Sequence, residues 1–523
     1  MSPHPDWREK LAQIVDGQGL VRDSARIAQL ATDVYRARSL PELVVRPASV
    51  EDLQAVVRTL GEAGVGFTVR GGGASYTDGY NVTDPAHLLI DMGRLDRIVE
   101  IDEYGGFVTV EAGVTWAQLS DALAAKGLRT PFRGPFSGLA ASVAGSMSQN
   151  AISHGSGAYG ISAESALSFD VVLADGSLLR TGSGAAGLKP FARHFGPDLT
   201  GLFTGDCGAL GIKARVTLPL LRGRPAHRVI SFAFGEFGQM HESMRRIALE
   251  RIEDSHFALD AALSQGQIAR QDRAGNRLGM ALSILRSSPS LTQGLRQVAA
   301  AGLKARRQIG KSAFMTHYIV EGFDDAEARA KVHRLRELNS DLGSEIAGTV
   351  PSVVRAMPFA PLFNTLGPNG ERWVPLHGIF AHADVARFHE ALTRFYAERA
   401  HEMKRHGVWG GGMYSTVGTG GFLYEIAIYW PDEQTPYHEA AVPADYLSGL
   451  TKFPANAEAR EYVHRFKGEL TELYDAHGAI HFQLGRAYPY ASRLSPEALR
   501  TVEAIKNALD PDHVIGPGVL GLS

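Results

Sequence analysis

Short apolar runs alternate with helical patterns along the first third of the chain. Residues 44–45 predict a strand, and Ser49 with Asp52 then forms a capping-box pattern at the start of a helix. Apolar residues recur at helical spacing between residues 53 and 60, which predicts one buried helix face. Residues 65–69 predict the next strand.

The alternation continues to about residue 220. Residues 107–113 predict a strand, and residues 116–126 predict a helix that follows it. The Asp175-Gly176 dipeptide stands between two apolar runs, which is a strong signal for a hairpin. Residues 212–218 predict a further strand.

The rest of the chain has a different pattern. Longer helical stretches, such as residues 385–406, lie between strands such as residues 422–429, which predicts a second domain beyond about residue 222. A helix over residues 496–509 leads into a tail that contains Gly516-Pro517-Gly518, a tight extended segment. The fold class that follows is α+β.

Composition and charge exclude several classes of protein. The 53 Lys and Arg residues nearly balance 56 Asp and Glu residues, so no basic surface for nucleic acid is expected. No apolar run is long enough for a membrane span, and the polar N-terminus lacks a signal core, which favours a cytoplasmic location. The single cysteine, Cys207, excludes an intramolecular disulfide and a thiolate metal cage, and is interpreted as a buried hydrophobe.

Glycine is the informative excess, with 58 of 523 residues. The segment Arg70 to Tyr76 follows a predicted strand directly and contains three consecutive glycines. Converging main-chain N–H groups in such a segment can bind an anion, and a pyrophosphate is the natural guest. An ordinary glycine-rich turn is the commoner meaning of a segment like this one.

Two further patterns carry less weight. Residues 155–160 spell G-x-G-x-x-G, but no strand precedes them and no convincing helix follows, so a nicotinamide Rossmann site is rejected. The pairs His477/His481 and His401/His406 lack metal-ligand spacing, and no metal site is predicted.

Taken in order along the chain, these segments resemble the vanillyl-alcohol oxidase / p-cresol methylhydroxylase (PCMH-type) flavoprotein superfamily. The segments that carry the resemblance are residues 46–53, 70–73, 89–93, 110–115, 142–145, 159–160, 171–182 and 509–518. Residues 195–197, Phe-Gly-Pro, look like the phenol-oxidising branch of that superfamily.

The resemblance implies a PCMH-type FAD-binding domain of two α/β subdomains over residues 1–222 and an α+β substrate or cap domain over residues 223–495. Residues 496–523 would be a tail that returns to the FAD domain. The implied FAD-binding residues are Arg70, Gly71, Gly72, Gly73, Ala74, Ser75, Tyr76, Ser137, Gly138, Ser142, Val143, Gly145, Ser148, Gly155, Tyr159, Gly160, Ile161 and Ile212.

Departures from the family pattern refine the expectation. Ala74 stands where relatives with a histidyl flavin link have histidine, and no cysteine lies between residues 130 and 206, so non-covalent FAD is expected. A tyrosyl link stays open. Ile161 stands where the phenol-oxidising branch has aspartate, and Gly516 stands where many relatives have asparagine.

The candidate catalytic residues are Arg486, Tyr488 and His481, with Tyr76 a weaker candidate. Arg486 would pair with a phenolate or carboxylate, Tyr488 would hydrogen-bond the substrate, and His481 would act as base. A packed aromatic strand with Arg486 in a structural ion pair is the alternative.

Three hypotheses of function follow for a chain expected to bind a small-molecule substrate and to form a homodimer. The first is an FAD-dependent oxidoreductase that takes a hydride from an alcohol or phenol, with oxygen, a cytochrome or a quinone as electron acceptor. The second is an FAD-linked 2-hydroxy-acid dehydrogenase, in which Arg486 holds the carboxylate. The third is a non-catalytic flavin-binding protein.

Overall fold

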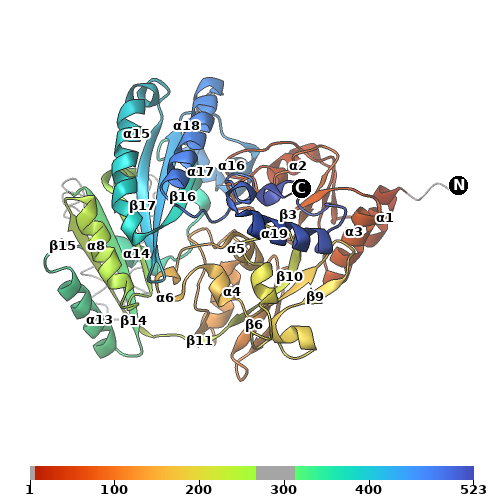
Figure 1. Ribbon diagram of the computed structural model, residues 1–523, viewed down its shortest axis with the longest axis horizontal. Coiled ribbons are helices and arrows are strands. Elements are labelled where there is room, and N and C mark those ends of the chain that lie inside the picture. Colours follow the sequence, from red (N-terminus) through yellow and green to blue (C-terminus); the bar gives the residue numbers. More distant parts are fainter. Residues whose placement is uncertain (1–5, 267–311, 523) are drawn as a thin grey trace.

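Two sheet-based units lie side by side in the computed structural model, which describes residues 6–266 and 312–522 (Figure 1). The unit with both chain termini contains two smaller sheets and the two-stranded pair of β7 (Leu128–Arg129) and β11 (Leu221–Arg222). The other unit contains one large sheet. Helices and strands are mixed in both units, which confirms the predicted α+β class.

The first sheet has the strand order β1-β2-β4-β3 and positions the glycine-rich segment. Its strands are β1 (Leu20–Val21), β2 (Val44–Val45), β4 (Leu88–Asp91) and β3 (Phe67–Arg70), the last three parallel. Helix α3 (Val50–Glu62) joins β2 to β3. The Asp52 N–H donates to Ser49 Oγ at 3.0 Å, which confirms the predicted N-cap. The apolar face of α3 is fully buried, as its spacing predicts.

The second sheet is antiparallel, with the order β5-β6-β10-β8-β9. Its strands are β5 (Ile98–Asp102), β6 (Phe107–Glu111), β10 (Ile212–Pro219), β8 (Ser168–Val172) and β9 (Leu178–Arg180). The β8–β9 hairpin closes at Asp175-Gly176, and Gly176 has a φ of +77° that suits glycine, so the predicted turn is confirmed.

Short helices complete this unit. They are α1 (Trp7–Ile14), α2 (Ser24–Ala31), α4 (Trp116–Ala124), α5 (Val143–Gln149), α6 (Ser156–Tyr159), α7 (Leu199–Leu202) and α19 (Pro496–Leu509). The segment after α19 lies beside β3, with the Phe67 N–H donating to Val514 O at 2.9 Å and the Gly516 N–H donating to Phe67 O at 2.8 Å. The C-terminal segment therefore extends the first sheet.

The large sheet is antiparallel, with the order β15-β12-β14-β13-β17-β18-β16. Its strands are β15 (Ser344–Ile346), β12 (Ala226–Phe234), β14 (Phe314–Gly322), β13 (Ser255–Asp260), β17 (Trp409–Val417), β18 (Gly421–Trp430) and β16 (Arg372–Ala381). The helices of this unit are α8 (Phe237–Ala248), α13 (Asp325–Leu338), α14 (Thr349–Ala356), α15 (Val385–Arg405), α16 (Pro436–Ala441), α17 (Ala444–Ser448) and α18 (Ala457–Ala476).

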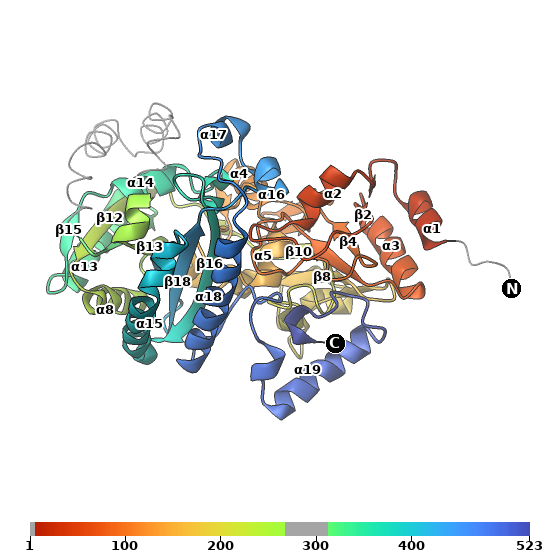
Figure 2. The ribbon, with the colours of Figure 1, turned by 90° about the horizontal axis from the view of Figure 1, so that it is seen from above.

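One face of the large sheet is covered by α8, α13, α15 and α18 (Figure 2). Phe422, Tyr424 and Ile426 alternate along β18 and pack in the same core cluster as residues of α15 and α18. Tyr414 and Tyr424 are core residues here, 2% and 1% exposed. Because strand side chains alternate between faces, the residues between them lie on the opposite face, toward the first unit.

Buried ion pairs join the two units. Asp254 beside β13 pairs with Arg129 at 2.9 Å and with Arg133, both from the first unit, and Glu321 of β14 also pairs with Arg133, at 3.5 Å. Burial opposes the ionisation of Asp254, but Arg133 and Arg129 outweigh it and lower the pKa of this carboxyl. Within the described ranges, no helix is long and apolar enough to cross a membrane.

Candidate functional site

The glycine-rich segment leaves β3 and lies tightly against a second loop of the first unit. A Cβ atom on Gly72 would lie 1.8 Å from Ala140 O, and one on Gly71 would lie 2.6 Å from Ser142 Oγ. Only glycine permits this approach of two backbones. The structure thus brings together two of the three loops predicted to hold FAD.

The main-chain N–H groups of this segment are free to bind a ligand. Among hydrogen bonds between described residues, none has an N–H group of Gly71 to Tyr76 as donor. Consecutive free N–H groups in a turn form a concavity for an anion, and buried main-chain donors normally find a partner. The segment therefore fits a pyrophosphate.

Arg70 does not contribute a free charge to that concavity. Its guanidinium pairs with Asp91 on the neighbouring strand β4 at 2.6 Å, and a Cβ on Gly73 would lie 2.1 Å from Arg70 Nη2. Arg70 supports the shape of the turn, while its charge is balanced by Asp91.

The second loop leads into α5. Ser142 is the N-cap of α5 and accepts from the Gly145 N–H at 3.2 Å, and Val143 is buried below it. Ser148 lies further along α5, where its carbonyl accepts from the Cys207 N–H at 2.9 Å. At the start of the loop, after Ser137, a Cβ on Gly138 would lie 2.4 Å from the Phe359 ring of the other unit.

The third predicted loop lies at the contact between the units. Gly155 and Gly160 flank α6 with φ angles of +95° and +82°, and the Arg129 guanidinium lies 5.8 Å from the Tyr159 ring. Ile161 follows and is half-buried, whereas Ile212 is buried at the start of β10. No main-chain hydrogen bond between described residues joins either isoleucine to the glycine segment.

Tyr76 extends from the glycine segment to the face of the large sheet that lies toward the first unit. Its ring centroid lies 5.6 Å from that of Trp373 and 5.8 Å from that of His377, both on β16. Burial, followed by the nearby Glu425 carboxyl, raises the pKa of Tyr76 well above its usual value.

His377, Glu425 and Met413 form one row across three adjacent strands. His377 is paired in register with Glu425, and Glu425 with Met413, so their side chains are immediate neighbours on the same face. Neither ring nitrogen of His377 has a hydrogen-bond partner in the described part of the chain, although the residue is fully buried. An unpartnered buried imidazole is costly, which makes the row a candidate for ligand binding.

Both ionisable groups of this row are neutral near pH 7. Burial raises the pKa of Glu425 to about 8, and burial together with His481 lowers the pKa of His377 well below its usual value. Glu425 keeps part of its side chain accessible. A perturbed acid beside a perturbed base is typical of sites that transfer protons.

Apolar and aromatic side chains surround the row. One cluster joins Phe257 and Trp373 of the sheet with Tyr76, Phe136 and Ala140 of the first unit. Ala140 is also the residue whose carbonyl approaches Gly72. The row and the glycine segment are therefore parts of one continuous site.

The predicted base and hydrogen-bonding tyrosine lie behind the row. His481 contacts His377 O at 2.7 Å and Asp475 Oδ1 at 2.9 Å through its two ring nitrogens. The Tyr488 hydroxyl accepts from the His377 N–H at 3.2 Å, and its ring stacks on His481 at 4.1 Å. These contacts make His481 and Tyr488 supports for β16.

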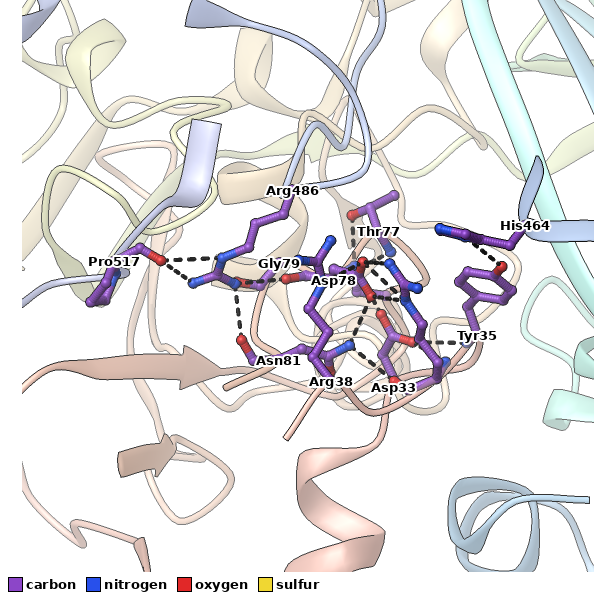
Figure 3. Close-up of polar contacts among 12 residues, drawn as sticks. Asp33, Tyr35, Arg38, Thr77, Asp78, Gly79, Asn81, His464, Arg486 and Pro517 are labelled. Atoms are coloured by element: carbon purple, nitrogen blue, oxygen red, sulfur yellow. Dashed lines mark hydrogen bonds and ion pairs between the residues drawn. The ribbon is translucent and has the colours of Figure 1, made fainter. Parts of the chain in front are cut away.

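Arg486 is held by main-chain carbonyl groups (Figure 3). It donates to Pro517 O at 2.6 Å, to Asp78 O at 2.8 Å, to Asn81 O at 3.0 Å and to Gly79 O at 3.3 Å. The structural ion pair suggested by the sequence is absent, since no carboxylate in the described part of the chain pairs with Arg486. It fastens the C-terminal segment to the loop after Tyr76.

Glu425 and His377 were not among the residues predicted from the sequence. Glu425 is the one carboxylate of the largely apolar strand Gly421–Trp430, and His377 is the one histidine of the strand Arg372–Ala381. Glutamate is rarely buried without a functional or structural reason, so this signal was present in the sequence.

Comparisons with known proteins agree with this geometry. Residues 41–182 match a family model described as an FAD binding domain. The chain is 32% identical over 200 residues to a glycolate oxidase subunit from Escherichia coli, covering 38% of each protein. It is 30% identical over 197 residues to a mitochondrial D-lactate dehydrogenase (cytochrome) from Arabidopsis thaliana, covering 38% of this chain and 33% of that one.

The fold is shared over almost the whole chain with a 4-ethylphenol oxidase from Gulosibacter chungangensis. The TM-score is 0.71 at 17% identity, covering 99% of this chain and 96% of that one. The curated relatives match over less than half of their length. Residues 41–182 therefore form an FAD-binding domain, as the sequence predicted, and the fold of the chain is that of this oxidase structure.

Proposed function

We propose that this protein is an FAD-dependent oxidoreductase that oxidises an alcohol or a phenol. The row His377–Glu425, enclosed by aromatic side chains and continuous with the glycine segment, is the observation that carries the proposal. The relatedness to an oxidase subunit and a dehydrogenase supports redox chemistry in general.

The residues present fit FAD. The N–H groups of Gly71 to Ser75 would hold the pyrophosphate, with Ser142 and Gly145 beside them. FAD, when bound, would provide the hydride acceptor. Ala74 occupies the position of a histidyl link, which supports non-covalent binding.

The chain's own task is to move the proton that the substrate hydroxyl loses. The ionised Glu425 carboxylate would accept this proton, and the neutral His377 imidazole beside it offers a second acceptor. Tyr76, whose pKa the Glu425 carboxyl raises, would orient the substrate oxygen. Trp373 and Phe257 would exclude water and pack against an aromatic or alkyl group.

An FAD-linked 2-hydroxy-acid dehydrogenase is the second candidate, because the glycolate and D-lactate enzymes are among the relatives. The row itself favours a neutral substrate, because it offers no positive charge to a carboxylate. The pKa of its carboxyl, Glu425, is raised, and that of its histidine, His377, is lowered. Arg486, the residue that would hold a carboxylate, donates its hydrogen bonds to main-chain carbonyl groups.

Anaerobic reduction of the bound flavin tests the proposal. The FAD-loaded protein is mixed with para-substituted phenols and aryl or alkyl alcohols in one series, and with D- and L-2-hydroxy acids in another. Loss of the oxidised flavin absorbance in the first series alone supports the proposal. Loss only in the second series replaces it with the second candidate, and no loss in either series indicates a non-catalytic flavin protein. The acceptor, a homodimer and a cytoplasmic location stay predictions.

A further inference from the structure

A separate cavity of about 480 Å³ lies where the C-terminal segment meets the loop after Tyr76. Arg38, Arg486, Tyr488, Tyr490, Ser492 and Pro517 line it. Its volume is in the range of sites for small metabolites. No part of the proposed oxidation uses this cavity.

The two arginines of the cavity differ in what they bind. Arg38 donates through Nε to Asp78 at 2.9 Å, and its two Nη atoms donate no hydrogen bond to a described residue. Arg486 donates to carbonyl groups and has no carboxylate partner in the described part of the chain. Arg38 thus keeps the forked pair of donors that suits a carboxylate or phosphate.

Asp33 and Asp78 lie beside Arg38 and Arg486 in this region (Figure 3). Asp78 is bound by Arg36 at 2.6 Å and by Arg38, and its N–H donates to Asp33 at 2.9 Å. Asp33 and Asp78 are both buried carboxyl groups, and burial together with Asp78 raises the pKa of Asp33 to about 7. One of the two carboxyl groups is therefore only partly charged at neutral pH.

Lys467 of α18 adds a further cation to the same region. Its ammonium lies 5.1 Å from the Tyr35 ring centroid and 5.7 Å from that of Tyr488, a wall of the cavity. Burial lowers the pKa of Lys467 to about 8, and the charge of Arg38 adds to burial in lowering that of Arg486 to about 10. Four cations around two carboxyl groups leave an excess that a bound anion would neutralise.

We propose that this cavity binds a small anionic molecule through a carboxylate or phosphate group, with Arg38 as the forked donor and Arg486 as the second positive charge. The site is distinct from the proposed oxidation site. Tyr488 separates them, since its ring lines the cavity and its hydroxyl contacts the His377 N–H.

Isothermal titration calorimetry of the FAD-loaded protein tests the proposal, with inorganic phosphate and succinate titrated separately at constant ionic strength set by chloride. We expect saturable binding at one site for at least one anion. Arg38→Gln should weaken it about tenfold or more, the loss expected for a hydrogen bond between two charged groups. Ser492→Trp, which fills the cavity at an exposed position and keeps both arginines, should also weaken it.

Arg405→Gln is the matched control, since Arg405 is 63% exposed at the end of α15. Unchanged binding in this variant, with weakening in the other two, supports the proposal, and the anion that binds names the ligand class. The proposal is overturned if neither anion saturates the protein, or if Arg38→Gln and Ser492→Trp bind like the control. The heat of anion binding requires no turnover, so its outcome is independent of the proposed oxidation.

Discussion

Glu425 on β18 and His377 on β16 are paired directly across an antiparallel ladder, and neither is charged near pH 7. The pair lies on the face of the large sheet that meets the glycine segment, reached by the Tyr76 ring. One sheet thus has two different faces, because the opposite face is an apolar core beneath α15 and α18.

The pH dependence of the reaction should follow Glu425. Only the ionised carboxylate accepts a proton, so the rate of flavin reduction by substrate should rise through about pH 8, the pKa to which burial raises Glu425. Glu425→Gln should lower the rate and remove this rise, measured by stopped-flow absorbance between pH 6 and 9. Glu461→Gln, 75% exposed on α18, should keep the wild-type profile.

Glu425→Gln should lower the rate of flavin reduction but raise the stability of the fold. The folded-state pKa of Glu425 lies above the unfolded value of about 4.3, so the folded state holds an extra proton between those pH values and loses stability as pH rises. Glu425→Gln should therefore unfold at a higher temperature than wild type at pH 8, with the gap closing toward pH 4. A constant gap across that range would contradict the raised pKa.

Gly72 tests the position of the cofactor. A Cβ at this residue meets Ala140 O at 1.8 Å, which forces the glycine segment away from the second loop. Gly72→Ala should yield folded protein with little bound flavin, measured as the ratio of flavin to protein absorbance. Gly468→Ala adds a methyl group where nothing lies within 4 Å and should retain the flavin. Full flavin content in both variants would place the pyrophosphate elsewhere.

A variant of Arg486 tests whether this residue stabilises the fold or binds the substrate. Its guanidinium holds four carbonyl groups, and removing a charged donor of this kind costs about 1.5–3 kcal/mol for each bond lost. Arg486→Ala should lower stability in urea by at least about 2 kcal/mol, while Arg500→Ala, 68% exposed, should change it by less than about 0.5 kcal/mol. Slower flavin reduction with unchanged stability would instead support a role of Arg486 in substrate binding.

The sequence predicted those parts of the molecule that local rules control. The Ser49 cap, the Asp175-Gly176 hairpin and the helix Pro496–Leu509 depend on neighbouring residues, and the structure confirms each. The contact between Gly72 and Ala140 depends on two segments some 70 residues apart, so a glycine run alone could not distinguish a cofactor loop from an ordinary turn.

The catalytic candidates depend instead on contacts between residues that are far apart in the sequence. The cluster of polar and aromatic residues around Arg486 in the sequence predicts a substrate contact, whereas the partners of its guanidinium come from residues 78–81 and 517, far away in the chain. The row of His377 and Glu425 forms only when β16 and β18 pair in register, and that register was not deducible from either strand alone.

Asp254 provides a test of the contact between the two units. The side chains of Arg129, Arg133 and Asp254 are largely buried, 10%, 19% and 3% exposed. Removing one partner of a buried ion pair leaves an uncompensated charge and costs about 3–5 kcal/mol, whereas an exposed pair contributes about 0–1 kcal/mol. Asp254→Asn should therefore lower the unfolding free energy far more than Asp341→Asn, whose partner Arg246 and own side chain are 31% and 60% exposed.

Because Asp254 lies at the contact between the units, its loss should act on both together. We expect the Asp254→Asn protein to lose flavin at a lower urea concentration, together with the near-ultraviolet circular dichroism of the aromatic cluster that joins the units. If flavin release and the aromatic signal keep their wild-type midpoints while only secondary structure is destabilised, the ion pairs do not hold the units together. Equal effects of Asp254→Asn and Asp341→Asn would contradict the burial of the charge.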